Sequence, residues 1–167
     1  MPRPDPMPLL IEAAEALGQK GQPRPLYEAL DRLTERAIGH KLFTLLVVDE
    51  KKREVQRVYT SNPKSYPVGG RKPLQMTGWG EQVVVGRRPY VGRNADDIKW
   101  AFFDHALIAS LGLASVLNVP VVHDGRCLGT MNLLHEAGWY SDSDAPVGTV
   151  FASLLIPAFA AEQGALR

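Results

Sequence analysis

Cysteine is almost absent from this sequence, because Cys127 is the only one among 167 residues. A single thiol forms no disulfide within one chain and completes no dithiol redox cycle. Cys127 also lies inside an apolar run, where a cysteine is usually a small buried side chain. We therefore expect neither a disulfide-stabilised protein nor a dithiol oxidoreductase.

An excess of charge is missing as well, since the formal net charge is +1 and no polybasic block occurs. Nucleic-acid and anionic-membrane binders usually carry such a block, so we expect no nucleic-acid partner and no membrane partner. No apolar run approaches the roughly 20 residues that span a bilayer, and the N-terminus lacks a signal-peptide core. The sequence therefore predicts a cytoplasmic protein.

Motifs of the common catalytic and metal sites are absent too. There is no nucleophile elbow, no glycine-rich phosphate loop and no HExxH pattern. His123 and Cys127 are the two metal-binding side chains near one turn, whereas a closed zinc site needs four. Asp104 and His105 suggest an acid–base pair, but adjacent helical residues point about 100° apart. The sequence predicts no catalytic residue, no metal and no cofactor.

The stretch that organises the chain, residues 112–135, predicts one β-hairpin. Two runs rich in Val and Leu are joined by Asp124-Gly125, which accepts the positive φ angles of a type I′ turn. With those two residues in the turn, Asn118 and Asn132 are expected on opposite faces, each surrounded by apolar side chains. We therefore expect a central pair of strands covered on both sides, with both carboxamides bonded to other groups.

Helical and alternating periodicity divides the rest of the chain into recognisable elements. In chain order we predict a loose arm (1–8), a short helix ending at Gly18, a helix from Pro25 to Gly39, strands at 41–49 and 54–60, and a helix from 141 that Pro157 kinks. We divide the chain into an arm with a short helix, residues 1–24, and a single domain, residues 25–167.

Residues 61–111 form a long excursion between two predicted strands. The excursion contains several prolines, the adjacent Gly69-Gly70, many aromatic side chains and short helical segments. Binding groups concentrate on loops held by a rigid scaffold, so this length indicates function. We expect an α+β sandwich, in which a central antiparallel sheet carries the N- and C-terminal helices on one face and the excursion on the other.

At this level the sequence resembles the GAF domain, a small-molecule sensing module related in shape to PAS domains. The resemblance covers residues 26–163 and is carried by these segments: Ile38-Gly39, Arg88-Pro89-Tyr90-Val91, the SxLxVPV pattern of residues 115–121 and the GxxLGxxNL pattern of residues 125–133. It implies that a ligand lies between the sheet and the excursion. It also implies pairing of two copies through the terminal helices.

Candidate ligand-binding residues are the polar and aromatic side chains of the excursion and of the strands beneath it. They are Arg57, Tyr59, Tyr66, Trp79, Arg93, Asp97, Trp100, Phe103, Asp104, His105, Asn118 and Asn132. Arg57 and Tyr59 are two residues apart on one strand, so we expect them above the same face. Alternative roles are core packing for the aromatics and a loop-bracing ion pair between Arg93 and Asp96 or Asp97.

Three functions fit these residues. The first is a sensor or regulatory module without chemistry of its own, which binds an unknown small molecule and signals through a homodimer or a partner chain. The second is a small enzyme acting on a polar metabolite, although the free-methionine-sulfoxide reductases of this fold use several cysteines. The third is a structural dimerisation module, since the apolar stripes of the terminal helices exceed what one sheet face covers.

Overall fold

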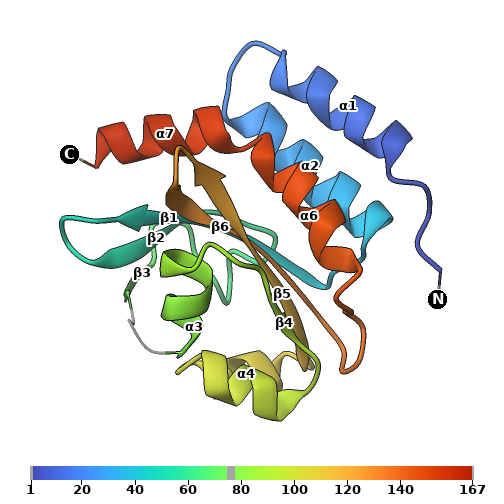
Figure 1. The fold of residues 1–167 in the computed structure, drawn as a ribbon, viewed down its shortest axis with the longest axis vertical. Coiled ribbons are helices and arrows are strands. Elements are labelled where there is room, and N and C mark those ends of the chain that lie inside the picture. Colours follow the sequence, from blue (N-terminus) through green and yellow to red (C-terminus); the bar gives the residue numbers. More distant parts are fainter. Residues whose placement is uncertain (1, 75–77, 167) are drawn as a thin grey trace.

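Six antiparallel strands form one sheet, in the order β3-β2-β1-β6-β5-β4 (Figure 1). The computed structural model describes residues 2–74 and 78–166. The strands are β1 (Leu42–Asp49), β2 (Glu54–Thr60), β3 (Arg71–Pro73), β4 (Tyr90–Gly92), β5 (Ser115–His123) and β6 (Arg126–His135). The two longest strands are β5 and β6, and β6 lies between β1 and β5 at the centre of the sheet, as the hairpin pattern predicts.

Helices cover one face of this sheet, which we call the helix face. They are α1 (Met7–Leu17), α2 (Arg24–Ala37), α6 (Asp144–Ser153) and α7 (Ile156–Ala165). The outer helix α1 packs on α2, whose Leu26, Leu30 and Leu33 are fully buried against the sheet side chains. Helices α6 and α7 meet at a 59° bend. Pro157, in the first turn of α7, donates no backbone hydrogen bond, which explains the predicted break.

The excursion covers the opposite face, which we call the cap face. The cap, residues 61–74 and 78–111, contains β3, β4, α3 (Gly78–Gly80), the π-helical turn η1 (Glu81–Val85), α4 (Ala95–Ala101) and α5 (His105–Ser110). Apolar side chains from the cap and from the sheet form a separate core there, which includes Tyr66, Val83 and Ile108. The predicted α+β architecture, with helices on one face and the excursion on the other, is confirmed.

A bulge in the hairpin corrects the predicted placement of the two asparagines. Asp124 and Gly125 do form the turn with positive φ angles of 51° and 71°. The strand register then shifts near Leu128, which faces no partner of its own on β5. Because an extra residue reverses the alternation of side chains, Asn118 and Asn132 lie directly opposite each other on the cap face. The prediction of one asparagine on each face is wrong.

A second bulge separates Arg57 from Tyr59 on β2. Leu46 of β1 pairs with Arg57, whereas Leu45 pairs with Tyr59, so the intervening residue has no partner on β1. The alternation is reversed here as well. Arg57 therefore lies on the cap face and Tyr59 on the helix face, where its hydroxyl donates to Asp31 Oδ2 of α2 at 2.7 Å. The predicted common face for the two side chains is wrong.

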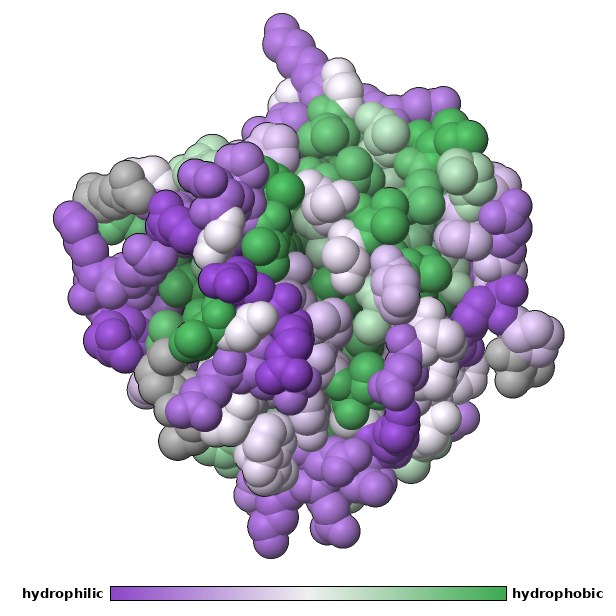
Figure 2. All heavy atoms as spheres, in the orientation of Figure 1, coloured by the Kyte–Doolittle hydropathy of each residue, from purple (hydrophilic) through white to green (hydrophobic). Residues whose placement is uncertain are grey.

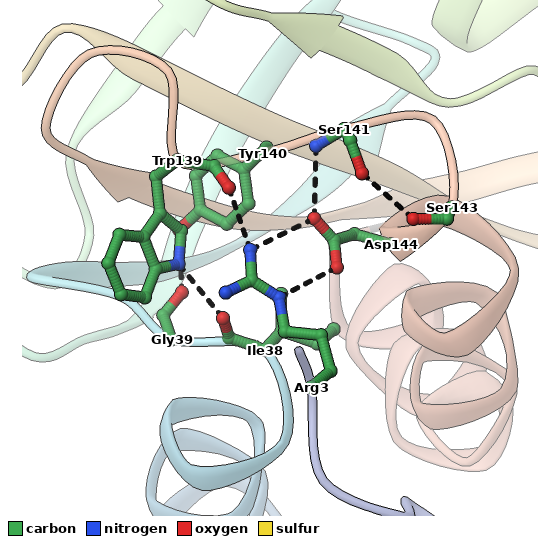
Figure 3. A network of polar contacts seen from close by, with 8 residues as sticks. All are labelled: Arg3, Ile38, Gly39, Trp139, Tyr140, Ser141, Ser143 and Asp144. Atoms are coloured by element: carbon green, nitrogen blue, oxygen red, sulfur yellow. Dashed lines mark hydrogen bonds and ion pairs between the residues drawn. The ribbon is translucent and has the colours of Figure 1, made fainter. Parts of the chain in front are cut away.

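The N-terminal arm is anchored to the start of α6 by Arg3 (Figure 3). The guanidinium of Arg3 donates to both carboxylate oxygens of Asp144, at 3.0 and 3.2 Å, and to the Trp139 carbonyl at 2.7 Å. It also lies over the Trp139 ring, 4.9 Å from the ring centre. The arm is therefore held by a charged anchor, and the predicted looseness of residues 1–8 is corrected from Arg3 onward.

Within the described ranges, no single helix is long and apolar enough to cross a membrane. The helices α6 and α7 reach the required length and hydropathy only as a pair, across their bend.

Candidate functional site

A cavity of about 40 Å³ lies between the cap face of the sheet and the cap. A second cavity of similar volume shares five of its lining residues, which are Leu46, Lys72, Trp79, Phe102 and Asp104. Such a volume has room for roughly three ordered waters or a ligand of a few heavy atoms. Apolar side chains form most of the wall, and the polar side chains fall into two clusters.

The carboxamide cluster joins three strands and the cap through hydrogen bonds. Asn118 Nδ2 donates to Asn132 Oδ1 at 2.8 Å, and Trp79 Nε1 donates to Asn118 Oδ1 at 3.0 Å. Asn132 Nδ2 lies 3.2 Å from the hydroxyl of Thr44 on β1. Each buried side-chain nitrogen and oxygen of this cluster has a hydrogen-bond partner. The cluster therefore fixes the position of Trp79, and with it the cap, in the absence of a ligand.

The charged cluster comes from β2, β3 and the cap. Lys72 Nζ lies 3.5 Å from Asp104 Oδ2, which also accepts a hydrogen bond from the Tyr66 hydroxyl at 3.2 Å. The guanidinium of Arg57 lies over the Tyr66 ring at 4.8 Å and donates through Nη1 to the Pro67 carbonyl at 3.1 Å. Asp104 therefore pairs with Lys72, while Arg57, which is only 6% exposed, has no ion pair of its own among the described residues.

Burial sets the electrostatics of this charged cluster. Loss of solvent lowers the pKa of Lys72, and the Asp104 carboxylate offsets part of that effect. Burial likewise lowers the pKa of the Arg57 guanidinium, with opposing contributions from Tyr66 and Asp104. The same desolvation, followed by the nearby Asp104 charge, raises the pKa of Tyr66 and keeps its hydroxyl a hydrogen-bond donor. The cluster thus carries an excess of one positive charge.

Two atoms of the charged cluster remain without hydrogen bonds. Arg57 Nε and Asp104 Oδ1 are both buried, and neither finds a partner among residues 2–74 and 78–166. One is a donor and the other an acceptor. A buried polar atom without a partner costs about 1–3 kcal/mol. Unlike the carboxamide cluster, the charged cluster is therefore incomplete by itself.

Six of the twelve predicted site residues line the first cavity, namely Arg57, Tyr66, Trp79, Asp104, Asn118 and Asn132. The bulge on β2 sends Tyr59 to the other face, as described above. Arg93 is exposed and pairs with Asp142 at 3.1 Å, so its predicted alternative partners, Asp96 and Asp97, are not its ion-pair partners. The Asp97 carboxylate accepts a hydrogen bond from the Arg93 backbone amide at 2.8 Å and lies outside the cavity.

Three further predicted residues lie on the outer side of the cap. Trp100 is 57% exposed and stacks on Tyr90, with ring centres 5.4 Å apart. Phe103 is 60% exposed and contributes only to the second cavity. His105, the first residue of α5, lies outside both sets of lining residues. Ile98 and Ile108 fill the buried sides of α4 and α5, while Trp100 lies on the exposed side of α4 and Phe103 in the link between the two helices.

Sequence reasoning missed Lys72 and Thr44. Lys72 lies on β3, a three-residue strand in a segment whose prolines and glycines predict a loop. A lysine in a loop is usually exposed to solvent. The pairing of β3 with β2 turns Lys72 inward beside Arg57, while Arg71 pairs with Glu54 at the surface. Thr44 has the β-branched shape of a strand residue, and only the opposite Asn132 gives its hydroxyl a role.

Cys127 takes no part in either cavity. Its thiol lies 3.3 Å from the Gly129 carbonyl, and burial raises its pKa to about 11. A thiol with such a pKa is almost entirely protonated at neutral pH and is a poor nucleophile.

No protein-family model and no curated protein matches this sequence. Solved structures do match its fold. A GAF domain from a phosphoenolpyruvate-protein phosphotransferase of Coxiella burnetii has a TM-score of 0.76 at 16% identity, over 96% of both chains. A domain of a putative two-component sensor histidine kinase from Sinorhizobium meliloti has a TM-score of 0.63 at 19% identity, over 89% of this chain and all of the other.

A free methionine-R-sulfoxide reductase from Neisseria meningitidis, solved in complex with its substrate, is also similar. Its TM-score is 0.72 at 20% identity, and the match covers 96% of this chain and 91% of that one. The fold of the present chain is therefore the GAF-type fold, as its sequence resemblance implies. At these identities the likeness concerns the fold alone.

Proposed function

We propose that this chain is a sensory or regulatory GAF-type module that binds a small polar molecule between its sheet and its cap, without catalysing a reaction. The observation that carries the proposal is the charged cluster of the buried Arg57 and the partly buried Lys72 and Asp104, which lines a cavity and is not fully hydrogen-bonded. Similarity to a sensor-kinase domain supports the regulatory part. A cytoplasmic location stays a prediction from the sequence.

The structure offers a route by which occupancy of the cavity would reach the helices. The strands β1 and β6 carry Thr44 and Asn132 on the cap face. On the helix face, Phe159 of α7 packs tightly over Gly129 of β6. A ligand that binds only one arrangement of the cap would shift the population of states, and the shared strands would pass that shift to α7.

The output would pass through a second copy of the chain that docks on α1 and α6. Figure 2 shows apolar surface gathered over the region where Figure 1 draws these two helices. Met7 and Ile11 of α1 and Val150 of α6 are large apolar side chains that are at least half exposed. Apolar patches of this kind on a protein surface commonly mark an interface.

Sedimentation equilibrium tests the dimer. We expect the wild type to form a dimer and Val150→Glu to be a monomer, because a buried carboxylate without a partner is costly at an interface. Val68→Glu, at a valine of the cap that is 62% exposed against 50% for Val150, is the matched control and should remain a dimer. A monomeric wild type at high concentration would refute this output route.

Native mass spectrometry of freshly purified protein tests ligand binding. We expect a small polar molecule to co-purify with the wild type and to be absent from Leu46→Phe, because Leu46 lines both cavities and a larger ring fills them. Val150→Phe adds comparable volume on the outside of α6 and should keep the molecule. Equal retention by both variants, or no small molecule together with no stabilisation by a library of polar metabolites, contradicts the proposal.

A further inference from the structure

We propose that the ligand of the cap cavity is a small 2-hydroxycarboxylate, held by its carboxylate on Arg57 and by its hydroxyl on Asp104. This inference rests on the proposed function and names the chemical class of its ligand. It follows from the hydrogen bonds, the charge and the size of the charged cluster.

The hydrogen bonds that are missing define the functional groups of the ligand. Arg57 is held by the Tyr66 ring and by the Pro67 carbonyl, while its Nε is a donor with no acceptor among residues 2–74 and 78–166. A carboxylate suits this edge, since guanidinium donors match its two oxygens. Asp104 uses Oδ2 for Tyr66 and Lys72, so Oδ1 still requires a donor such as a hydroxyl group.

The charge of the cluster selects an anion. Arg57 and Lys72 contribute two positive charges, and Asp104 contributes one negative charge. A 2-hydroxycarboxylate carries a single negative charge and balances the cluster. A 2-amino acid also offers a donor and a carboxylate, but its net charge is zero and its ammonium group would lie near two cations. The hydroxy acid therefore fits the electrostatics better.

The size of the cavity limits the ligand to few atoms. Each of the two adjoining cavities measures about 40 Å³. The carboxamide cluster closes the far end, because Asn118, Asn132 and Trp79 are bonded to one another. Two-carbon and three-carbon acids match this space, whereas a sugar or a nucleotide would require the cap to leave the sheet.

Such a ligand would connect the sheet to the cap. Arg57 belongs to β2, and Asp104 lies at the junction of α4 and α5. Arg57 itself contacts the cap at the Pro67 carbonyl and the Tyr66 ring. The contacts of Asp104 with Lys72, at 3.5 Å, and with the Tyr66 hydroxyl, at 3.2 Å, lie within the cap. Hydrogen bonds from one molecule to Arg57 and to Asp104 would hold the cap more firmly, which provides a signal.

Calorimetric titration of the full chain with sodium glycolate, sodium acetate and glycine, at matched ionic strength, tests the assignment. Glycolate and acetate differ by one hydroxyl group. We expect glycolate to bind roughly tenfold or more tightly than acetate, because a hydrogen bond to a buried charged group has about that effect. Glycine should bind more weakly than glycolate. Equal affinity for glycolate and acetate, or tighter binding of glycine, overturns the assignment.

Variants of Asp104 locate the hydroxyl group. Asp104→Ala should reduce the ratio of glycolate to acetate affinity to about one, while Asp96→Ala, at an exposed residue of α4, keeps the ratio of the wild type. If Asp104→Ala does not fold, Asp104→Asn takes its place. Its amide oxygen would face Tyr66 and Lys72, and its amide nitrogen, at the former position of Oδ1, would not accept a hydrogen bond from the hydroxyl group. An unchanged ratio in the folded variant contradicts a contact with Asp104.

Arg57→Lys should weaken both acids by roughly tenfold, because an ammonium group lacks the planar pair of donors. Arg53→Lys, in the exposed turn before β2, should leave both affinities unchanged. If a small molecule co-purifies with the wild type but not with Leu46→Phe, and the protein does not prefer glycolate over acetate, this ligand class is refuted and the proposed function stands. If no small molecule co-purifies or binds and glycolate is not preferred, both the ligand class and the proposed function are refuted.

Discussion

The two faces of the sheet are built differently. On the helix face, the buried polar groups are hydrogen-bonded to neighbours: Gln163 of α7 donates to the Val48 carbonyl at 3.0 Å, and Tyr140 donates to the Gly39 carbonyl at 2.7 Å. On the cap face, Arg57 and Asp104 each keep an atom without a partner among the described residues. The polar groups of the helix face therefore stabilise the fold, whereas the atoms without partners at the cavity of the cap face lower its stability.

Packing follows the same division. The helix face contains the larger core, with fully buried aromatic side chains such as Phe43, Phe151 and Phe159. The cap face contains a smaller core and both small cavities. Asp144, a buried charge at the start of α6, is paired with Arg3, whereas the buried Arg57 of the cap face has no ion-pair partner among the described residues. Charged groups in an interior are costly unless they are paired, so the unpaired Arg57 indicates a selected property of the cap face.

The largest effect is expected from truncation on the helix face. Phe159→Ala should lower the free energy of unfolding by about 3–5 kcal/mol, because the ring is fully buried between α7 and β6. Val85→Ala, at an exposed position of η1 outside the proposed dimer interface, should change it by less than about 0.5 kcal/mol. Urea denaturation measures both. A loss below about 1 kcal/mol for Phe159→Ala would show that this face is not the stabilising one.

A smaller effect is expected from the carboxamide cluster on the cap face. Asn118→Leu should cost about 1–3 kcal/mol, because it removes the hydrogen-bond partner of Trp79 Nε1 and of Asn132 Oδ1. The double variant with Asn132→Leu should cost clearly less than the sum of the two single changes, since two apolar groups then face each other. Denaturant titration of all four proteins gives the coupling. Additive costs would indicate that the two carboxamides do not interact.

The N-terminal anchor should contribute less again. Arg3→Ala should lower the unfolding free energy by about 1–2 kcal/mol, because it removes charge-assisted hydrogen bonds to Asp144 and Trp139. Arg24→Ala removes an exposed ion pair with Glu28 and serves as the control, for which we expect no measurable change. Thermal unfolding compares the two. Equal effects of the two changes would mean that the arm is not anchored.

The smallest effect concerns pH. His135 accepts a hydrogen bond at Nδ1 from the Glu136 amide at 2.8 Å and stacks on Trp139. Burial and the neighbouring Lys41 lower its pKa in the folded state below the ordinary value of 6.5. The unfolded chain therefore takes up a proton first, and stability should fall as the pH drops below 6.5. His135→Gln should lack this component, which a comparison of urea midpoints between about pH 5 and pH 8 detects.

Local sequence patterns predict the elements of this fold, but they do not predict the two bulges. The Asp124-Gly125 turn, the apolar strands and Pro157 each have a local signature, and the structure confirms them. The bulges near Leu128 and between Arg57 and Tyr59 depend on pairing with neighbouring strands, which one strand's sequence does not show. Those two insertions decide which polar side chains enter the cavity.

The candidate site was predictable in part. Trp79 follows from the helical spacing of apolar residues in the cap, Asn118 and Asn132 follow from the central hairpin, and all three line the first cavity. Lys72 has no such signal, because β3 forms only through its pairing with β2. Trp100 shows the opposite case, since a helix as short as α4 has too few residues to reveal which side is buried, and Phe103 lies in the link after it.

Native-state hydrogen exchange of the ligand-free protein tests the central claim that the two faces differ in stability. Amides of α4 and α5 in the cap should exchange through local opening, with an opening free energy well below that of global unfolding. Amides of α2 and α7 should exchange only through global unfolding. Cap amides that are protected as strongly as those of α2 and α7 would contradict the account.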